Sequence, residues 1–160
     1  MSQHLYDRTS RTVAASDIPP DVLAKLEAHA AERMLDPVAT TATACVATRS
    51  VSLKKPGFLA RLGGVPAEAE NHTFAVLTPG TLLVASAGEK RGVTVLSTRL
   101  ADIEVVGQID PAYAIDSSIQ VQGRWGGPEA ASYSVALGDD PAGQEFHAAL
   151  RAAVAAVKRG

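Results

Sequence analysis

The feature that most constrains this fold is an order of elements. Seven short strand-like runs lie between Ala39 and Leu137, and one amphipathic helix follows them. The runs are rich in Val, Ile, Leu and Thr, which favour strands, and turns that contain Gly or Pro separate them. This order is typical of a small, bent antiparallel sheet or barrel that a helix closes at one open end. The predicted class is therefore mainly β with α.

The C-terminal helix carries the clearest local pattern. Asp140 suits the N-cap and Pro141 suits the first helical position. Apolar residues then recur at spacings of four, four and three, which places them on one face of the helix: Phe146, Leu150, Val154 and Val157. We expect this helix to close the open end of the sheet.

The N-terminal part of the chain divides into two segments. Residues 1–15 show no period and are predicted to form a flexible N-terminal arm. The stretch 17–21 is typical of a helix start, and apolar residues recur at helical spacing up to Met34. The predicted helix covers 16–36, because a residue before proline, here Asp36 before Pro37, is pushed out of the α region. The main domain then covers 37–160.

Composition limits the function classes. A chain of 160 residues, 46% of them hydrophobic, can bury one core without a metal or disulfide. The net charge of −2 argues against a nucleic-acid binder, which needs clustered cations. A single cysteine, Cys45, cannot form an intramolecular disulfide. Because the first residues are polar and no apolar run is long enough to span a membrane, we expect a cytoplasmic protein.

With these elements in place, residues 39–158 resemble a bacterial pleckstrin-homology-like (PH-like) domain. The resemblance rests on the hairpin of 74–78 and 82–84, on Val95-Leu96, and on the run 100–105. It implies a seven-stranded antiparallel PH-like barrel or sandwich, made of two near-orthogonal sheets, with the C-terminal helix at one corner. It also makes the helix predicted over 16–36 an addition to the family core.

The basic residues depart from the pattern of the eukaryotic lipid-binding members of this family. The resemblance implies a basic cluster at the end of the first strand and on the second. Here Lys54, Lys55 and Arg61 occupy the first loop, but the second strand, over 72–78, has no Lys or Arg. Half of the pattern is missing, which argues against recognition of a specific lipid head group.

The first loop is the foremost candidate for partner contact. It combines cations with apolar side chains: Lys54, Lys55, Phe58, Leu59, Arg61 and Leu62. Such a loop suits the surface of an anionic membrane, where each cation contributes about 1 kcal/mol. It also suits a docked peptide. In the simpler interpretation, the apolar side chains fold back over the open barrel end while the cations stay solvated.

Two further places are candidates for contact. Lys90 and Arg91 lie at a charged hairpin tip, whose simpler interpretation is a solvated turn. Trp125 ends the sixth predicted strand on its apolar face. There it could line a pocket or an interface, where aromatic residues are enriched, or pack beneath the C-terminal helix against Phe146.

No motif in the sequence indicates catalysis. The histidines lack metal-ligand spacing, and no glycine-rich phosphate loop is present, so we expect neither a metal nor a cofactor. The predicted function is a non-catalytic binding or scaffold module that contacts a protein partner or, weakly, an anionic membrane. A homo-oligomer is compatible with this role. The alternative is a carrier of a small apolar ligand, held in the barrel interior or at its mouth near Trp125.

Overall fold

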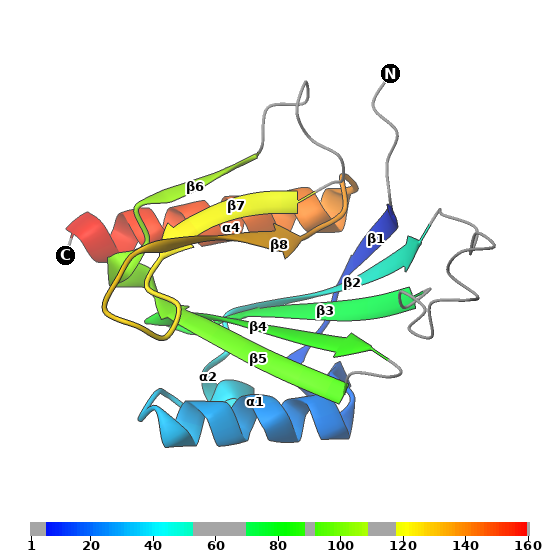
Figure 1. The fold of residues 1–160 in the computed structure, drawn as a ribbon, viewed down its shortest axis with the longest axis horizontal. Coiled ribbons are helices and arrows are strands. Elements are labelled where there is room, and N and C mark those ends of the chain that lie inside the picture. The colour runs from blue at the N-terminus through cyan, green and yellow to red at the C-terminus, as the bar shows by residue number, and fades with distance from the viewer. Residues whose placement is uncertain (1–5, 53–69, 89–91, 109–117, 160) are drawn as a thin grey trace, which may run out of the picture.

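The computed structural model describes residues 6–52, 70–88, 92–108 and 118–159. Eight strands in these ranges form two antiparallel sheets (Figure 1). The larger sheet has the order β1-β2-β3-β4-β5 and the smaller one the order β6-β7-β8. The strands are β1 (Tyr6–Thr12), β2 (Ala44–Ser52), β3 (Glu70–Leu77), β4 (Thr81–Gly88), β5 (Gly92–Arg99), β6 (Val105–Gln108), β7 (Ser118–Gly123) and β8 (Ala131–Ala136).

The larger sheet lies between two layers (Figure 1). Helices α1 (Pro20–Glu32) and α2 (Val38–Thr41) cover one face, while α4 (Pro141–Arg159) and the smaller sheet cover the other. The seven strands predicted between Ala39 and Leu137 are present as β2 to β8, and the predicted C-terminal helix follows them. Within the described residues, no ladder joins the two sheets, so they do not form a closed barrel.

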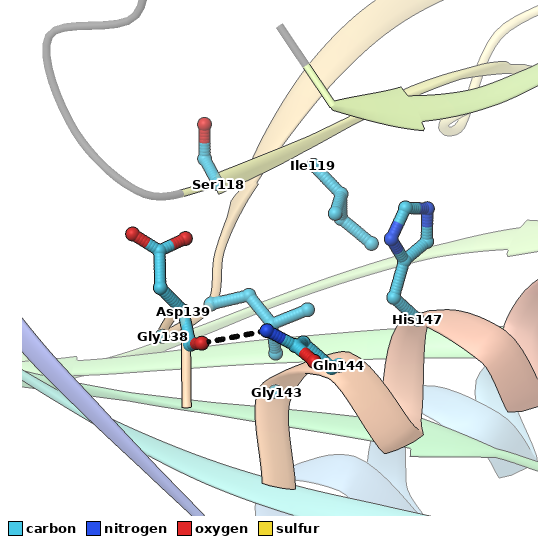
Figure 2. A pocket seen from close by; sticks show the side chains of 8 residues that line it. Ser118, Ile119, Gly138, Asp139, Gly143, Gln144 and His147 are labelled. Carbon is cyan, nitrogen blue, oxygen red and sulfur yellow. Dashed lines mark hydrogen bonds between the residues drawn. The ribbon is translucent and has the colours of Figure 1, made fainter. Parts of the chain in front are cut away.

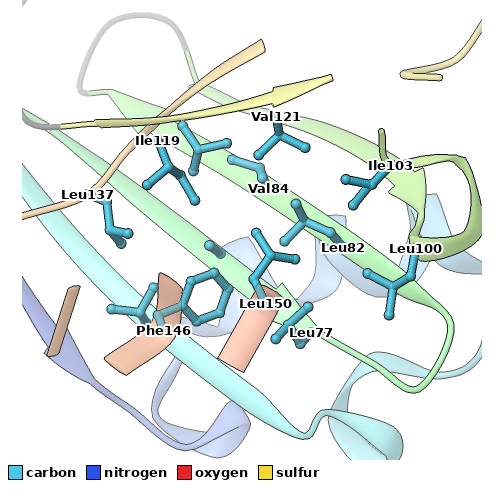
Figure 3. Close-up of a cluster of buried hydrophobic side chains, with 13 residues drawn as sticks. Leu77, Leu82, Val84, Leu100, Ile103, Ile119, Val121, Leu137, Phe146 and Leu150 are labelled. Atoms are coloured by element: carbon cyan, nitrogen blue, oxygen red, sulfur yellow. The ribbon is translucent and has the colours of Figure 1, made fainter. Parts of the chain in front are cut away.

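Both faces of the larger sheet are buried at its centre. On β3, Phe74 and Val76 point into a core cluster beneath α1, while Ala75 and Leu77 point into a second cluster beneath α4. Figure 3 shows the second cluster, in which α4 contributes Phe146 and Leu150. This arrangement explains why β3 and β4 carry continuous apolar runs instead of an alternating pattern.

The prediction of a flexible arm over 1–15 is wrong for residues 6–12, because these residues form strand β1. This strand pairs antiparallel with β2 along its whole length. Its sequence is polar, and its position depends on distant partners. The Ser10 hydroxyl lies 2.6 Å from the Thr48 hydroxyl and accepts the Gly138 N–H at 2.8 Å. The Ser10 N–H donates to Asp140 Oδ2 at 2.7 Å. None of these contacts can be predicted from the residues that neighbour Ser10 in the sequence.

The prediction that a strand begins at Ala39 is also wrong. The residues of α2 are helical, and β2 begins at Ala44. The Glu27 carboxylate of α1 accepts hydrogen bonds from the N–H groups of Val38 and Ala39, at the free end of this short helix. A side chain from another element therefore overrides the β propensity of the threonines.

The two longer helices begin close to the predicted positions. A 3₁₀ turn over Ala15–Asp17 precedes α1, which ends at Glu32 instead of at 36. The α4 helix starts at Pro141, and the Asp140 carboxylate accepts the Gly143 N–H at 3.1 Å, as expected of an N-cap. Among the described residues, no helix is both long and apolar enough to cross a membrane.

Candidate anion-binding site

Three arginines from distant parts of the chain line one open hollow of about 250 Å³. Arg33 is the C-cap of α1, Arg99 is the last residue of β5, and Arg124 directly follows β7. We call this hollow the arginine groove. Its other lining residues are Leu35, Ser97, Asp102, Gly126, Gly127 and Pro128.

The arginines of the groove have no acidic partner in the part of the chain that the structure describes. The ion pairs there join Glu70 to Arg49 and to His72, on exposed parts of β2 and β3. The hydrogen bond from Arg49 lowers the pKa of Glu70. Asp102 lies on the wall of the groove but makes no such pair with any of the three arginines. The groove therefore carries an excess of positive charge, although the whole chain is slightly acidic.

A close backbone approach places Arg124 at the groove. A Cβ atom at Gly123 would lie 2.7 Å from Thr98 Oγ1, so only glycine lets the end of β7 come this near to β5. The Arg124 N–H then donates to the same Thr98 oxygen at 3.2 Å. In the following turn, Gly126 has a φ of 123°, a conformation that favours glycine, and a Cβ atom there would lie 3.6 Å from Arg33 Nη2.

A histidine–serine pair lies behind the groove. His29 Nε2 is 2.8 Å from the hydroxyl of Ser97, a residue that lines the hollow. Burial, and then the Arg33 guanidinium, lower the pKa of His29, while Glu32 opposes the shift. Its surroundings therefore favour the neutral imidazole. The pair has the spacing of a nucleophile and its base, but among the described residues no carboxylate orients the other ring nitrogen, as a catalytic triad would require.

A second cavity lies between β7 and the start of α4 (Figure 2). Its volume is about 10 Å³, roughly the room that one water needs. His147 lines it, and the buried Nε2 of this ring has no hydrogen-bond partner among the described residues. Burial and the nearby Arg151 lower the pKa of His147. The cavity is too small for an organic ligand, so we do not regard it as a binding site.

Most of the contact residues predicted from the sequence lie outside the described residues. This holds for the first loop, with Lys54, Lys55, Phe58, Leu59, Arg61 and Leu62, and for the hairpin tip, with Lys90 and Arg91. The structure therefore does not describe where these residues lie relative to the arginine groove.

Trp125 is the one predicted contact residue within the described ranges. Its ring packs against the core cluster that contains Phe146, and it contacts Tyr133 with ring centroids 5.1 Å apart. Its Nε1–H donates to the Val121 carbonyl at 3.3 Å. Trp125 thus faces the core, while the residues on either side of it, Arg124 and Gly126, line the groove. The indole anchors the turn that forms this wall.

Sequence reasoning missed the arginine groove. Each of its arginines stands at the end of a helix or strand, where a charged side chain is ordinarily solvated. Only the packing of α1, β5 and β7 brings the three together. Comparison with protein-family models, with curated proteins and with solved structures found no match to this chain.

Proposed function

We propose that this protein is a PH-like, non-catalytic binding module that recognises an acidic segment of a partner protein in the arginine groove. The observation that carries the proposal is that three arginines, which make no ion pair among the described residues, line one hollow. Guanidinium presents a planar fork of donors that matches a carboxylate, which makes arginine the usual residue for binding such groups. An acidic ligand would also relieve the mutual repulsion of the three cations.

The element order supports the PH-like part of this proposal. The seven strands β2 to β8 are followed by α4, which is the order that the family resemblance implies. In this view β1, α1 and α2 are additions to the family core. They are functional additions, because α1 supplies Arg33 and thus one wall of the groove.

The recessed shape of the site favours a protein segment over a membrane surface. A flat bilayer meets protruding cations, whereas side-chain carboxylates can enter a hollow whose walls come from three elements. The apolar-carrier alternative finds no comparable support. The space between the larger sheet, the smaller sheet and α4 is filled by a cluster of 13 buried side chains (Figure 3).

Binding of a fluorescein-labelled hexa-aspartate peptide, followed by fluorescence anisotropy at low salt, tests the proposal. We expect Arg33→Gln, Arg99→Gln and Arg124→Gln each to weaken binding about fivefold, since an exposed charge pair contributes up to about 1 kcal/mol. The triple variant should abolish binding. The matched control is Arg11→Gln, an equal loss of charge on β1, at the opposite edge of the sheet from β5.

Two results would overturn this assignment. If Arg11→Gln weakened binding as much as the groove variants, the peptide would be responding to net charge and not to a site. If the wild-type chain ignored the peptide but bound vesicles of phosphatidylcholine and phosphatidylserine, with the same dependence on the groove arginines, the partner would be a membrane.

A further inference from the structure

We propose that His29 is a proton-dependent switch of the arginine groove: its protonation turns the Ser97 hydroxyl towards a bound anion and strengthens binding. This inference rests on the proposed function and adds to it a residue that does not itself line the groove. It starts from one contact, the 2.8 Å hydrogen bond between His29 Nε2 and Ser97 Oγ.

The direction of this hydrogen bond depends on the tautomer of the neutral ring and on the charge of the ring. When neutral His29 has no hydrogen on Nε2, this atom can only accept, and the Ser97 hydroxyl must donate its hydrogen to the ring. The oxygen lone pairs are then the part of Ser97 left to face an anion. Protonated His29 carries hydrogens on both ring nitrogens, so Nε2 donates to Ser97 Oγ. The hydroxyl hydrogen becomes free to donate to the bound anion.

The added charge acts in the same direction as this reorientation. His29 stands one helical turn before Arg33 on α1, and its Nε2 touches a residue of the groove wall. A protonated ring therefore adds a fourth cation directly behind the wall. An acidic ligand interacts more strongly with this state than with the neutral one.

Few other charged groups near His29 can imitate this effect. On α1 the charges that act on the ring are those of Arg33 and Glu32. The β5 strand contributes Arg99 on the same face as Ser97, and the 3₁₀ turn before α1 contributes Asp17. The packed elements α2 and β4 contain no titratable side chain. His29 is the only histidine among these groups, and histidine is the side chain whose ordinary pKa places its change of charge between about pH 5 and pH 8.

The sign of the pH dependence follows from linkage. In the free protein the pKa of His29 lies below its ordinary value, so the neutral ring is favoured and gains its proton only as the pH falls. A bound anion favours the protonated ring and raises this pKa. By reciprocity, protonation raises the affinity for the anion, and affinity increases as the pH falls.

Two measurements with the hexa-aspartate peptide test the switch. By anisotropy, we expect wild-type affinity to be on the order of fivefold higher at about pH 5 than at about pH 7.5. The neutral variant His29→Gln keeps an amide donor near the position of Nε2 and should lose this gain. Ser97→Ala keeps the histidine but has no hydroxyl, and should lose most of the gain. By NMR, the pKa of His29 in the wild-type chain should rise when the peptide binds.

The outcomes distinguish a failure of the His29 switch from a failure of the proposed binding site. If the peptide binds but His29→Gln retains the full pH dependence, or the pKa of His29 does not move, the switch is wrong and the groove stands. If Ser97→Ala retains the full gain, the hydroxyl mechanism is wrong. If the wild-type chain does not bind the peptide at any pH, the proposed function fails and the switch fails with it. Circular dichroism establishes that each variant is folded.

Discussion

Met34 adopts a backbone conformation that is unfavourable for its residue type. Its φ is 56°, and it follows the C-cap of α1, where glycine is the usual residue. The Leu35 N–H donates to the Ala30 carbonyl at 2.8 Å, and the Met34 N–H donates to the Ala31 carbonyl at 3.2 Å. These two bonds form a Schellman motif. The Met34 side chain is 91% exposed, so its packing does not compensate for the strained backbone.

We therefore expect Met34→Gly to raise the free energy of unfolding by about 0.5–1 kcal/mol. Glycine relieves about 1–2 kcal/mol of left-handed strain, and the greater freedom of the unfolded chain offsets part of this gain. Urea denaturation measures the change. Met34→Ala is the control, because it removes the side chain but keeps the strain, and it should bring no gain. A lower stability of Met34→Gly would contradict this account.

At the scale of residues, the arginine groove shows which part of a site cannot be predicted from a sequence. Nothing local distinguishes Arg33, Arg99 and Arg124 from other charged residues at the ends of elements. Their meeting depends on the contact between Gly123 and Thr98, which joins the two sheets. Residue chemistry was readable from the sequence, but the convergence of these residues was not, because it arises from packing between elements.

At the scale of elements, the start of α4 is fixed by a close contact with the segment before it. A Cβ atom at Gly143 would lie 2.0 Å from the Gly138 carbonyl oxygen, which is too close for any real contact. Alanine usually stabilises a helix by about 1 kcal/mol relative to glycine. Here we expect the opposite sign.

Gly143→Ala should lower the free energy of unfolding by about 2 kcal/mol, since the helix and the 138–140 segment must move apart. Urea denaturation measures this loss. Gly80→Ala is the matched comparison, because a Cβ atom there meets nothing within 4 Å, and its effect should be small. If the two variants were equally stable, α4 would not be held by the close approach of Gly138.

The elements predicted correctly are those with local patterns. Asp140, Pro141 and an apolar stripe predict the α4 helix, and the alternation of apolar and polar residues predicts β7. By contrast, β1 and α2 depend on distant partners. Ser10 of β1 bonds to residues near 138, and the free N–H groups of α2 bond to Glu27. Propensity and periodicity describe only neighbours along the chain, so they cannot predict either element.

For the whole molecule, two histidines link stability to pH. Burial is the largest cause that lowers the pKa of both His29 and His147. The unfolded chain therefore binds these protons more readily than the folded one. Their contribution to stability is fully present above about pH 6.5 and is lost as the pH falls towards the folded-state pKa values.

We expect His147→Leu to reduce this loss of stability in acid. The variant removes a buried nitrogen that has no hydrogen-bond partner in the described part of the chain, so it should match or exceed the wild-type stability at about pH 7.5. At about pH 5 it should be clearly more stable, because no buried proton has to be bound. Urea midpoints at the two pH values measure the difference. Parallel declines of the variant and the wild type would exclude a contribution from His147.

The link between Ser10 and Asp140 also has a consequence for the order of folding. These residues are 130 positions apart, and contacts between such distant segments close the largest loops and form late. During synthesis β1 leaves the ribosome before every other described strand, yet it gains its full set of bonds only when Asp140 has been made. Until then the Ser10 N–H at the edge of β1 lacks its Asp140 partner, and unpaired N–H groups at a sheet edge can pair with other chains. In pulse-labelling hydrogen exchange, the Ser10 amide should therefore become protected later than the amides of β3.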